Sequence, residues 1–239
     1  MSEAFEYVGD ELDVFAHATR WKDYFGSQLR PVIQGDVLEV GAGIGSTARA
    51  LASASVHSWT ALEPDPRMGE ALEQKLRACG ARHGFSARRF QGTIRSLEAS
   101  PRFDAILYID VLEHIEDDRG ELEQAARRLR PGGKLCVLSP ALPWLFSEFD
   151  EQIGHHRRYD RASLVALTPP RTRLCWVRSL DSVGIAASLA NRFLLRSPTP
   201  TRSQIEVWDR LLVPLSRPLD RLLRYRVGRS IAAVWERDL

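Results

Sequence analysis

The sequence predicts an α/β protein built as a three-layer sandwich, with helices on both faces of a mostly parallel sheet. Strand-like and helix-like segments alternate over residues 36–140. The apolar runs VLEV, AILYI and LCVL are continuous, as in strands covered on both faces. The segments between them are long enough for helical crossovers, which return the chain to a parallel neighbour.

Each element follows from its own pattern. Apolar residues at helical spacing predict a leading helix over residues 11–29, which Pro31 ends. After it we expect strands over 36–42, 58–64, 87–92, 103–110 and 134–140, and helices over 46–54, 67–78 and 119–129. We expect Asp117 or Asp118 to cap the last of these helices, because Asp is a favoured N-cap residue.

The regular alternation ends at Pro140. Residues 140–160 form a long connection rich in aromatic, acidic and histidine residues, and connections of that length are usually functional. A strand over 173–180, a helix over 204–226 that Pro214 and Pro218 should kink or split, and a strand over 230–236 complete the chain.

Composition narrows the class of protein. Hydrophobic residues make up 44% and charged residues 27% of the 239, as in soluble globular proteins. A net charge of +2 is too small to predict nucleic-acid binding. From Arg171 onward, however, 13 arginines face 6 acidic residues, a net charge of +7. We interpret these arginines as solvated helix faces, with an acidic partner or a membrane surface as the alternative.

The compartment is predicted from cysteines and from the first residues. Three cysteines lie far apart without a CxxC motif, which favours a reducing environment. The acidic start lacks the pattern of a secretory signal, and no apolar run is long enough to span a membrane. We therefore expect a cytoplasmic protein.

The most informative stretch is VLEVGAGIGSTARAL at residues 37–51, a strand that enters a helix through Gly41, Gly43 and Gly45. Glycines at such a turn let the backbone approach a ligand closely. Ser46 stands where the dinucleotide fingerprint needs glycine. Glu39 would repel a pyrophosphate but attract an ammonium or a sulfonium, so the loop favours a cationic ligand.

The ends of the following strands carry further candidates. Glu63 lies 22 residues after Gly41, close to the spacing at which an acid accepts both ribose hydroxyls. Thr93 follows the third strand and Asp110 ends the fourth. The carboxyl ends of parallel strands meet at one edge, where open α/β sheets bind ligands.

Taken together, the loop at 39–45, Glu63, DVLEHIEDD at 110–118 and LRPGGKLCVLSP at 129–140 resemble the class I S-adenosylmethionine-dependent methyltransferases. HATRWKDYF before the loop and FDEQIGHHRRYDRASL after the fifth strand resemble a bacterial subgroup associated with small-molecule and glycan substrates. The resemblance implies a Rossmann-like, seven-stranded sheet whose last strand is antiparallel, with an extra N-terminal helix and a C-terminal helical insertion. It also implies S-adenosylmethionine as cofactor.

The resemblance assigns roles to individual positions. Gly41, Ala42 and Gly43, in the turn that Gly45 completes, would pass beneath the methionine part of the cofactor. Glu63, followed by Pro64, would hold the ribose, and Thr93 and Ile94 would flank the adenine. Asp110 and Val111 would lie near the sulfonium or the acceptor. Many relatives have Asp where this chain has Thr93, so a hydroxyl or the backbone would replace that contact.

The resemblance and the connection suggest one domain over 1–239, with a helical cap at 1–35, a cofactor-binding core at 36–140, and acceptor-side loop and helices at 141–230. In the loop, we predict that His155 is a general base that Asp150 orients. The alternative is that Asp150 pairs with Arg157 or Arg158 to hold the loop shut. His114 is interpreted as a packed histidine. We predict no metal site, because His155 and His156 are adjacent and lack a third ligand at suitable spacing.

The predicted reaction is methyl transfer to a small molecule or to a glycan or lipid intermediate, at a hydroxyl rather than at an amine or carbon. The alternatives are an enzyme that uses S-adenosylmethionine for another reaction, such as a cyclisation, and an NAD(P)-dependent oxidoreductase. Six aromatic residues could wall the acceptor pocket: Trp21, Tyr24 and Phe25 of the leading helix, and Trp144, Phe146 and Phe149 of the 140–160 connection. For the helix at 204–226 we favour core packing over a peripheral membrane contact. The sequence sets no oligomeric state.

Overall fold

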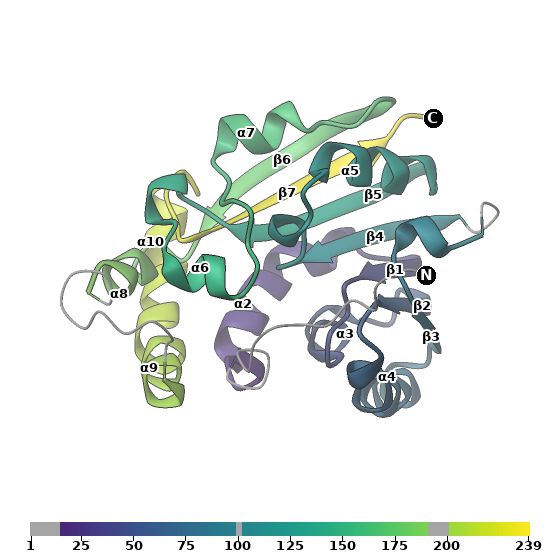
Figure 1. Cartoon of the computed structure of the whole chain (residues 1–239), viewed down its shortest axis with the longest axis horizontal. Coiled ribbons are helices and arrows are strands. Elements are labelled where there is room, and N and C mark those ends of the chain that lie inside the picture. The colour runs from purple at the N-terminus through teal and green to yellow at the C-terminus, as the bar shows by residue number, and fades with distance from the viewer. Residues whose placement is uncertain (1–14, 99–101, 191–200) are drawn as a thin grey trace.

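The computed structural model describes residues 15–98, 102–190 and 201–239 and contains one seven-stranded sheet (Figure 1). Its order is β3-β2-β1-β4-β5-β7-β6. β7 is antiparallel to both β5 and β6, and the other pairs are parallel, which confirms the expected sheet. The strands are β1 (Gly35–Val40), β2 (Val56–Glu63), β3 (Ser86–Gln91), β4 (Phe103–Ile109), β5 (Leu129–Pro140), β6 (Thr172–Leu180) and β7 (Ser230–Arg237).

Helices cover both faces of this sheet, so the predicted three layers are confirmed. In β1, Val37 packs into one hydrophobic cluster and its neighbour Leu38 into the other. The first cluster includes residues of α2 (Thr19–Leu29), α3 (Ser46–Leu51), α4 (Gly69–His83), α9 (Arg202–Val207) and α10 (Val213–Leu222). The second includes residues of α5 (Asp118–Arg127) and α7 (Arg161–Ala166). Two further helices are α6 (Glu148–Gln152) and α8 (Gly184–Ala190).

The ends of several helices differ from the prediction. The expected helix at 11–29 is interrupted at residues 17–18, and its first four positions lie outside the described residues. α3 ends at Leu51, and α4 runs on to His83, where Gly84 at φ 83° ends it. Asp117 caps α5 by accepting from the Gly120 amide at 3.0 Å, as predicted.

The proline-containing helix is interrupted by a π-helical turn over Trp208–Leu212. Pro214 stands in the first turn of α10, where it needs no N–H. The carbonyl of Arg210, four residues earlier, instead accepts from Arg20 Nη1 at 2.7 Å. The segment is helical from α9 through this turn to the end of α10, which contains Pro218, so the split expected at the two prolines is absent. The segment packs on α2.

Among the described residues, no helix is both long and apolar enough to cross a bilayer. The division of the chain into a cap, a core and an acceptor-side region stays a prediction.

Candidate active site

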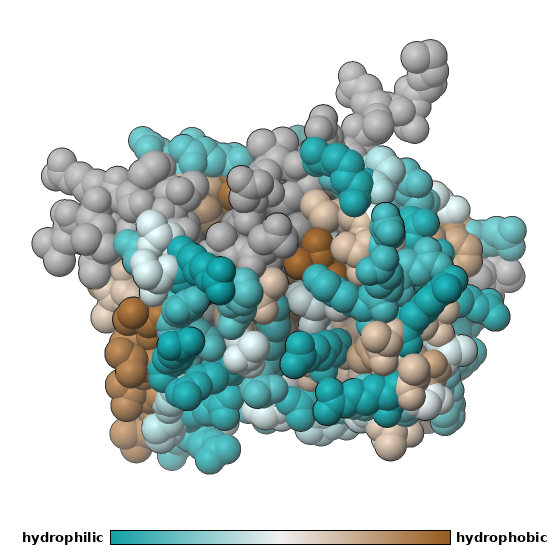
Figure 2. All heavy atoms as spheres, turned by 90° about the horizontal axis from the view of Figure 1, so that it is seen from below, coloured by the Kyte–Doolittle hydropathy of each residue, from teal (hydrophilic) through white to brown (hydrophobic). Residues whose placement is uncertain are grey.

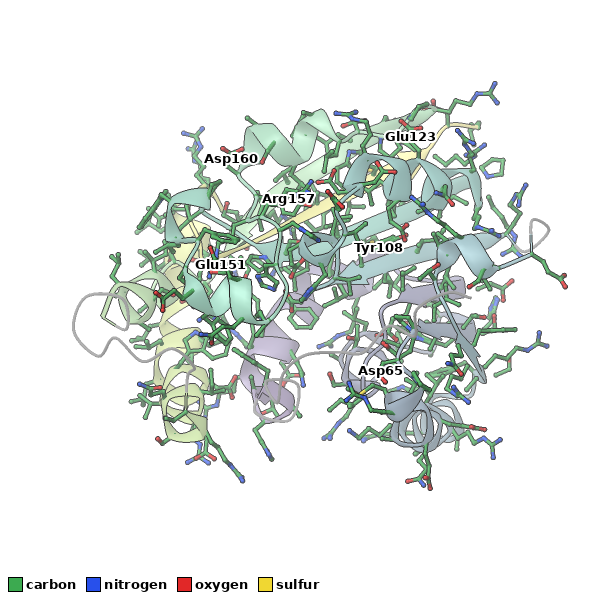
Figure 3. The ribbon with its side chains drawn as sticks, viewed as in Figure 1. Asp65, Tyr108, Glu123, Glu151, Arg157 and Asp160 are labelled. Atoms are coloured by element: carbon green, nitrogen blue, oxygen red, sulfur yellow. The ribbon has the colours of Figure 1, made fainter. Side chains whose placement is uncertain are left out.

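A cavity of about 1520 Å³ opens at the carboxyl ends of the parallel strands. Its lining includes Gly41 after β1, Glu63 at the end of β2, Asp110 after β4 and Pro140 at the end of β5. β1 and β4 are neighbours in the sheet although β2 and β3 separate them in sequence, so the cavity lies at the switch point where open α/β sheets bind ligands. In Figure 3, Asp65 marks the chain just after β2, and Glu151 marks α6, whose residues Glu148, Phe149 and Asp150 line the cavity.

The glycine loop between β1 and α3 is fixed by backbone geometry. Gly41, Gly43 and Gly45 have φ values of 68°, 51° and 78°, in the left-handed region that favours glycine. A Cβ on Gly41 would lie 2.5 Å from Val111 Cγ2, so any side chain there would displace Val111. The Ala42 amide donates to the Leu62 carbonyl at 2.9 Å, which ties the loop to β2.

Glu63 faces the cavity from β2 and is held by the same loop. Its carboxylate accepts from the Gly43 amide at 2.7 Å and from the Asp65 amide at 2.9 Å. Burial raises the pKa of Glu63, although these two hydrogen bonds oppose the shift. Each of its oxygens receives one donor and retains a lone pair, so the group can still accept two hydroxyls.

Eight of the eleven predicted cofactor residues line the cavity, namely Gly41, Ala42, Gly43, Glu63, Pro64, Thr93, Asp110 and Val111. Glu39, Gly45 and Ile94 do not. Glu39 is buried beneath the loop and accepts from Trp59 Nε1 at 2.8 Å, and burial raises its pKa to about 7. Gly45 is the N-cap of α3, and the Ile94 side chain belongs to the core. These three residues support the cavity wall from behind.

Asp110 has a strained backbone at the edge of the cavity. Its φ of 54° is unusual for a residue other than glycine, and its amide donates to the Leu138 carbonyl at 2.8 Å. Asp110 lines the cavity, and desolvation by the surrounding protein raises its pKa to about 6, against the attraction of nearby basic side chains. Its position is consistent with the predicted place near the reacting atoms.

His155 lines the same cavity from the segment after α6. Its Nδ1 lies 2.9 Å from Asp150 Oδ1, and its Nε2 lies 3.8 Å from Glu113 Oε1. In the neutral tautomer whose Nδ1–H donates to the Asp150 carboxylate, Nε2 carries the lone pair. The two residues that the sequence paired as base and orienter are therefore in contact.

Asp150 is also the centre of the ion pair that the alternative interpretation predicted. Arg158 donates to both of its oxygens at 2.9 Å, and the Ser147 amide and hydroxyl donate to Oδ2 at 2.9 Å each. Burial alone would raise the pKa of Asp150, but the hydrogen bonds from His155 and Arg158 outweigh it and lower the pKa to about 2. Arg157 pairs instead with Asp118 at 2.8 Å.

Beside His155 lie two more titratable groups. The rings of His114 and His155 meet edge to face at 4.6 Å, and burial, reinforced by His155, lowers the pKa of His114 to about 4. Glu113 is fully buried, and burial together with Asp110 raises its pKa well above the usual range. Glu113, His114 and His155 present possible ligand atoms within 4.8 Å of one another. The absence of a metal site was predicted from the adjacent His155 and His156, not from this group, and it stays a prediction.

Several lining residues were not identified from the sequence, and three of them carry titratable side chains beside the strand ends: Glu113, Lys22 and Arg229. Burial lowers the pKa of Lys22 to about 8, and Arg229 pairs with Asp181 at 3.3 Å. Arg229 could not be placed beforehand because it reaches the site only through the antiparallel return of β7. Of the six aromatic residues expected at the acceptor pocket, Trp21, Phe25, Phe146 and Phe149 line the cavity, whereas Tyr24 and Trp144 do not.

Comparisons with known proteins agree with this geometry. Residues 38–135 match the family model described as a methyltransferase domain. The chain is 30% identical over 132 residues to the demethylmenaquinone methyltransferase of Tropheryma whipplei strain Twist, covering 55% of this chain and 53% of that protein. It is 34% identical over 161 residues to the ubiquinone biosynthesis O-methyltransferase of Xylella fastidiosa strain 9a5c, covering 57% and 63%. The chain thus spans between half and two thirds of the relatives' length.

A solved structure extends the likeness to the whole fold. Phospholethanolamine N-methyltransferase 2 of Haemonchus contortus, solved with phosphomonomethylethanolamine and S-adenosylhomocysteine, superimposes with a TM-score of 0.60 at 13% identity. The match covers 96% of this chain and 58% of that one. Residues 38–135 of this chain therefore match a methyltransferase domain, and the chain has the fold of solved methyltransferases, one of which binds S-adenosylhomocysteine. S-adenosylmethionine is the cofactor that these matches support.

Proposed function

We propose that this protein transfers a methyl group from S-adenosylmethionine to a hydroxyl group of a small, largely apolar molecule, with His155 as general base. The contact between His155 Nδ1 and Asp150 Oδ1, on the wall of the cavity that Glu63 and the glycine loop also line, carries the proposal.

The cavity fits the cofactor on three counts. Gly41 and Gly43 line it in the left-handed conformation, so the backbone of the loop faces the cavity without a side chain at either position. Glu63 presents two carboxylate oxygens that suit the vicinal hydroxyls of a ribose. Thr93 lies on the lining after β3, where the family resemblance would put the adenine. When bound, S-adenosylmethionine supplies a methyl group already activated on a positively charged sulfur.

With the donor activated, the residues of this chain have to hold the acceptor in line and keep water out, which can contribute several kcal/mol. Trp21, Phe25, Phe146 and Phe149 supply the apolar wall for this purpose. They come from α2 and from the 141–160 segment, which are far apart in sequence. Together they would enclose an aromatic or aliphatic acceptor over the strand ends.

A neutral hydroxyl must lose its proton as its oxygen bonds to the methyl carbon and the carbon–sulfur bond breaks. His155 Nε2 takes that proton in the proposal, because Nδ1 is occupied by Asp150. The pKa of Asp150, about 2, keeps it ionised, so it holds the ring and stabilises the imidazolium that forms. Asp150 is therefore a positioning residue and His155 the catalytic one.

The choice of a hydroxyl acceptor is supported by the relative named as an O-methyltransferase of ubiquinone biosynthesis. Both curated relatives are named for quinones, demethylmenaquinone in one case and ubiquinone biosynthesis in the other. An apolar acceptor of the quinone type suits the aromatic lining, and we place the protein in the cytoplasm.

The direct test is to incubate the protein and S-adenosylmethionine with candidate phenolic and lipid-extract acceptors, and to follow S-adenosylhomocysteine and methylated product by mass spectrometry. The proposal expects both products in equal amounts. A reaction that consumes the cofactor without an acceptor gaining a methyl group would instead support the alternative of a non-transfer reaction.

A further inference from the structure

One outer face of the molecule carries an unusual row of apolar side chains. Along α9, the π-helical turn and α10, Val207, Leu211, Leu215 and Leu222 are 54%, 60%, 58% and 78% exposed. Leu219 and Leu223 are exposed beside them. These six residues are called the leucine face below. In Figure 2, hydrophobic atoms gather along the left edge, the side on which α9 and α10 lie in Figure 1.

The leucine face is not the side by which this segment packs on the domain. The inner side buries Ile205, Trp208 and Val213 in the hydrophobic core. Asp209 accepts from the amides of Arg20 and Trp21 at 3.2 and 2.8 Å, which ties the segment to α2. With its inner side held in this way, the helix presents its leucines outward in a fixed orientation. A row of apolar side chains of this extent usually marks an interaction surface.

Charge next to the leucine face indicates what kind of partner it fits. Arg221, Arg224 and Arg226 are exposed around Leu222 and Leu223, and within the described part of the chain none of the three has an acidic partner. A protein partner would need apolar and acidic groups at positions that match these side chains. An anionic bilayer needs no such match, because acyl chains lie directly beneath its negative headgroups everywhere on its surface.

We propose that the leucine face binds the surface of an anionic phospholipid bilayer, with the leucines in the acyl boundary and the three arginines at the headgroups. The same segment lines the cavity with Gln204, Ile205 and Leu212. The docked protein would therefore hold its cavity close to the membrane. This second consequence rests on the proposed function, because it makes a membrane-resident acceptor directly available to the site.

Vesicle sedimentation tests the docking without any acceptor. The full chain is mixed with phosphatidylcholine vesicles that contain or lack phosphatidylglycerol. Binding is expected only with phosphatidylglycerol, and it should weaken as salt is added. Failure to bind the anionic vesicles at low salt would overturn the proposal.

Two variants separate the apolar and charged contributions. Leu211→Ser/Leu215→Ser/Leu222→Ser should lower the partition coefficient at least about tenfold, with the exposed Phe90→Ser on β3 as its control. Unchanged binding of the triple serine variant would contradict the role of the leucine face.

For the charges, Arg221→Gln/Arg224→Gln/Arg226→Gln should lower the partition coefficient about a hundredfold, since each arginine contributes about fivefold. Arg77→Gln/Arg82→Gln/Arg88→Gln, which removes the same charge from α4 and β3, should retain binding. Equal losses in both sets would show a nonspecific effect of net charge and would overturn the docking face.

Light scattering of the same proteins tests whether a second copy of the chain, and not a membrane, covers the leucine face. A wild-type dimer that the serine variant converts to a monomer, without vesicle binding by either, would refute the membrane proposal. Titration with S-adenosylhomocysteine distinguishes the two proposals. Vesicle binding without S-adenosylhomocysteine binding would refute only the proposed function. S-adenosylhomocysteine binding without vesicle binding would refute only the docking.

Discussion

Glu63 serves two purposes, since it fixes the glycine loop and faces the ligand cavity. The sequence could identify this residue because its distance from Gly41 along the chain places it at the end of the neighbouring strand. The sequence could not show that Gly43 donates to it, because that contact depends on how the loop turns. The same limit applies to Glu39, which the sequence placed at the ligand and the structure places behind the loop.

Replacing Glu63 with alanine should weaken S-adenosylhomocysteine binding by about 1 to 3 kcal/mol, the usual loss for a buried charge-assisted hydrogen bond. Isothermal titration calorimetry measures this change, with Glu123→Ala on α5 as a control that removes an acid away from the cavity. Wild-type affinity in Glu63→Ala would disprove the assignment of the ribose.

At Gly43, an aspartate should abolish cofactor binding while leaving the protein folded, because it places a carboxylate at the loop beside Glu63. Gly84→Asp is the matched control, since Gly84 also has a positive φ and a side chain there would meet no atom within 4 Å. Calorimetry measures cofactor binding by the two variants, and circular dichroism shows whether each of them is folded. Loss of fold in the first variant, or binding by it, would contradict this view of the loop.

The role of His155 predicts that His155→Ala lowers kcat by about 10² to 10⁴ while leaving the affinity for S-adenosylhomocysteine nearly unchanged. His57→Ala is the control, because His57 is an exposed histidine of β2 that is not among the residues lining the cavity. If turnover in His155→Ala equals that of the wild type, His155 only supports the loop and the base lies elsewhere.

Among the elements, the segment between β5 and β6 shows how a buried carboxylate can organise a connection. Sequence composition indicated that residues 140–160 were functional, and it named Asp150, His155 and Arg158. It did not predict α6, because a helix of five residues leaves no periodic pattern. The capping box from Ser147 to Asp150, which begins α6, is the local signal that could have predicted this helix.

The buried Asp150 network predicts a dependence of stability on pH. The folded pKa of about 2 lies below the ordinary 3.8, so the stabilisation is full above about pH 5 and is lost as the pH falls through the folded pKa. The shift corresponds to about 2 kcal/mol. Urea unfolding between pH 5 and pH 2 should show a steeper loss for the wild type than for Asp150→Asn. Parallel curves for the two proteins would show that Asp150 makes no such contribution.

Helix α2 depends on a residue from the other end of the chain. Its N-cap, Ala18, makes no side-chain hydrogen bond, and Asp209, 188 residues after Trp21, accepts from the first amides instead. No local pattern could predict such a cap. Asp209→Ala should cost about 1 to 2 kcal/mol of unfolding free energy, whereas alanine at Asp23, an exposed acid of the same helix, should cost far less. Equal costs would contradict the capping role.

For the whole molecule, the rhythm of strands and helices was sufficient to predict the three layers, because crossover chirality and burial on both faces leave few arrangements. The antiparallel β7 was implied only by the resemblance to a family. The cavity could be placed at the strand ends, but its aromatic wall could not be completed, since α2 and the 141–160 segment meet only through the tertiary fold.

The role of His155 as a base requires that no metal ion is bound to its Nε2. Removing metal ions by dialysis against EDTA should therefore leave turnover unchanged. Activity that is lost on dialysis and restored by a divalent cation would instead assign Glu113, His114 and His155 to a metal ion. Thermal denaturation with and without the cation provides a readout that does not depend on turnover.

The central claim is that Glu63 and the loop from Gly41 to Gly43 hold the adenosine and methionine parts of S-adenosylmethionine beside His155. A crystal structure of the protein with S-adenosylhomocysteine measures this most directly. The ribose hydroxyls should lie within hydrogen-bond distance of the Glu63 carboxylate, with the sulfur near Asp110. Crystals in which the nucleoside lies outside this cavity, or in which the cavity stays empty at saturating ligand, would contradict the claim.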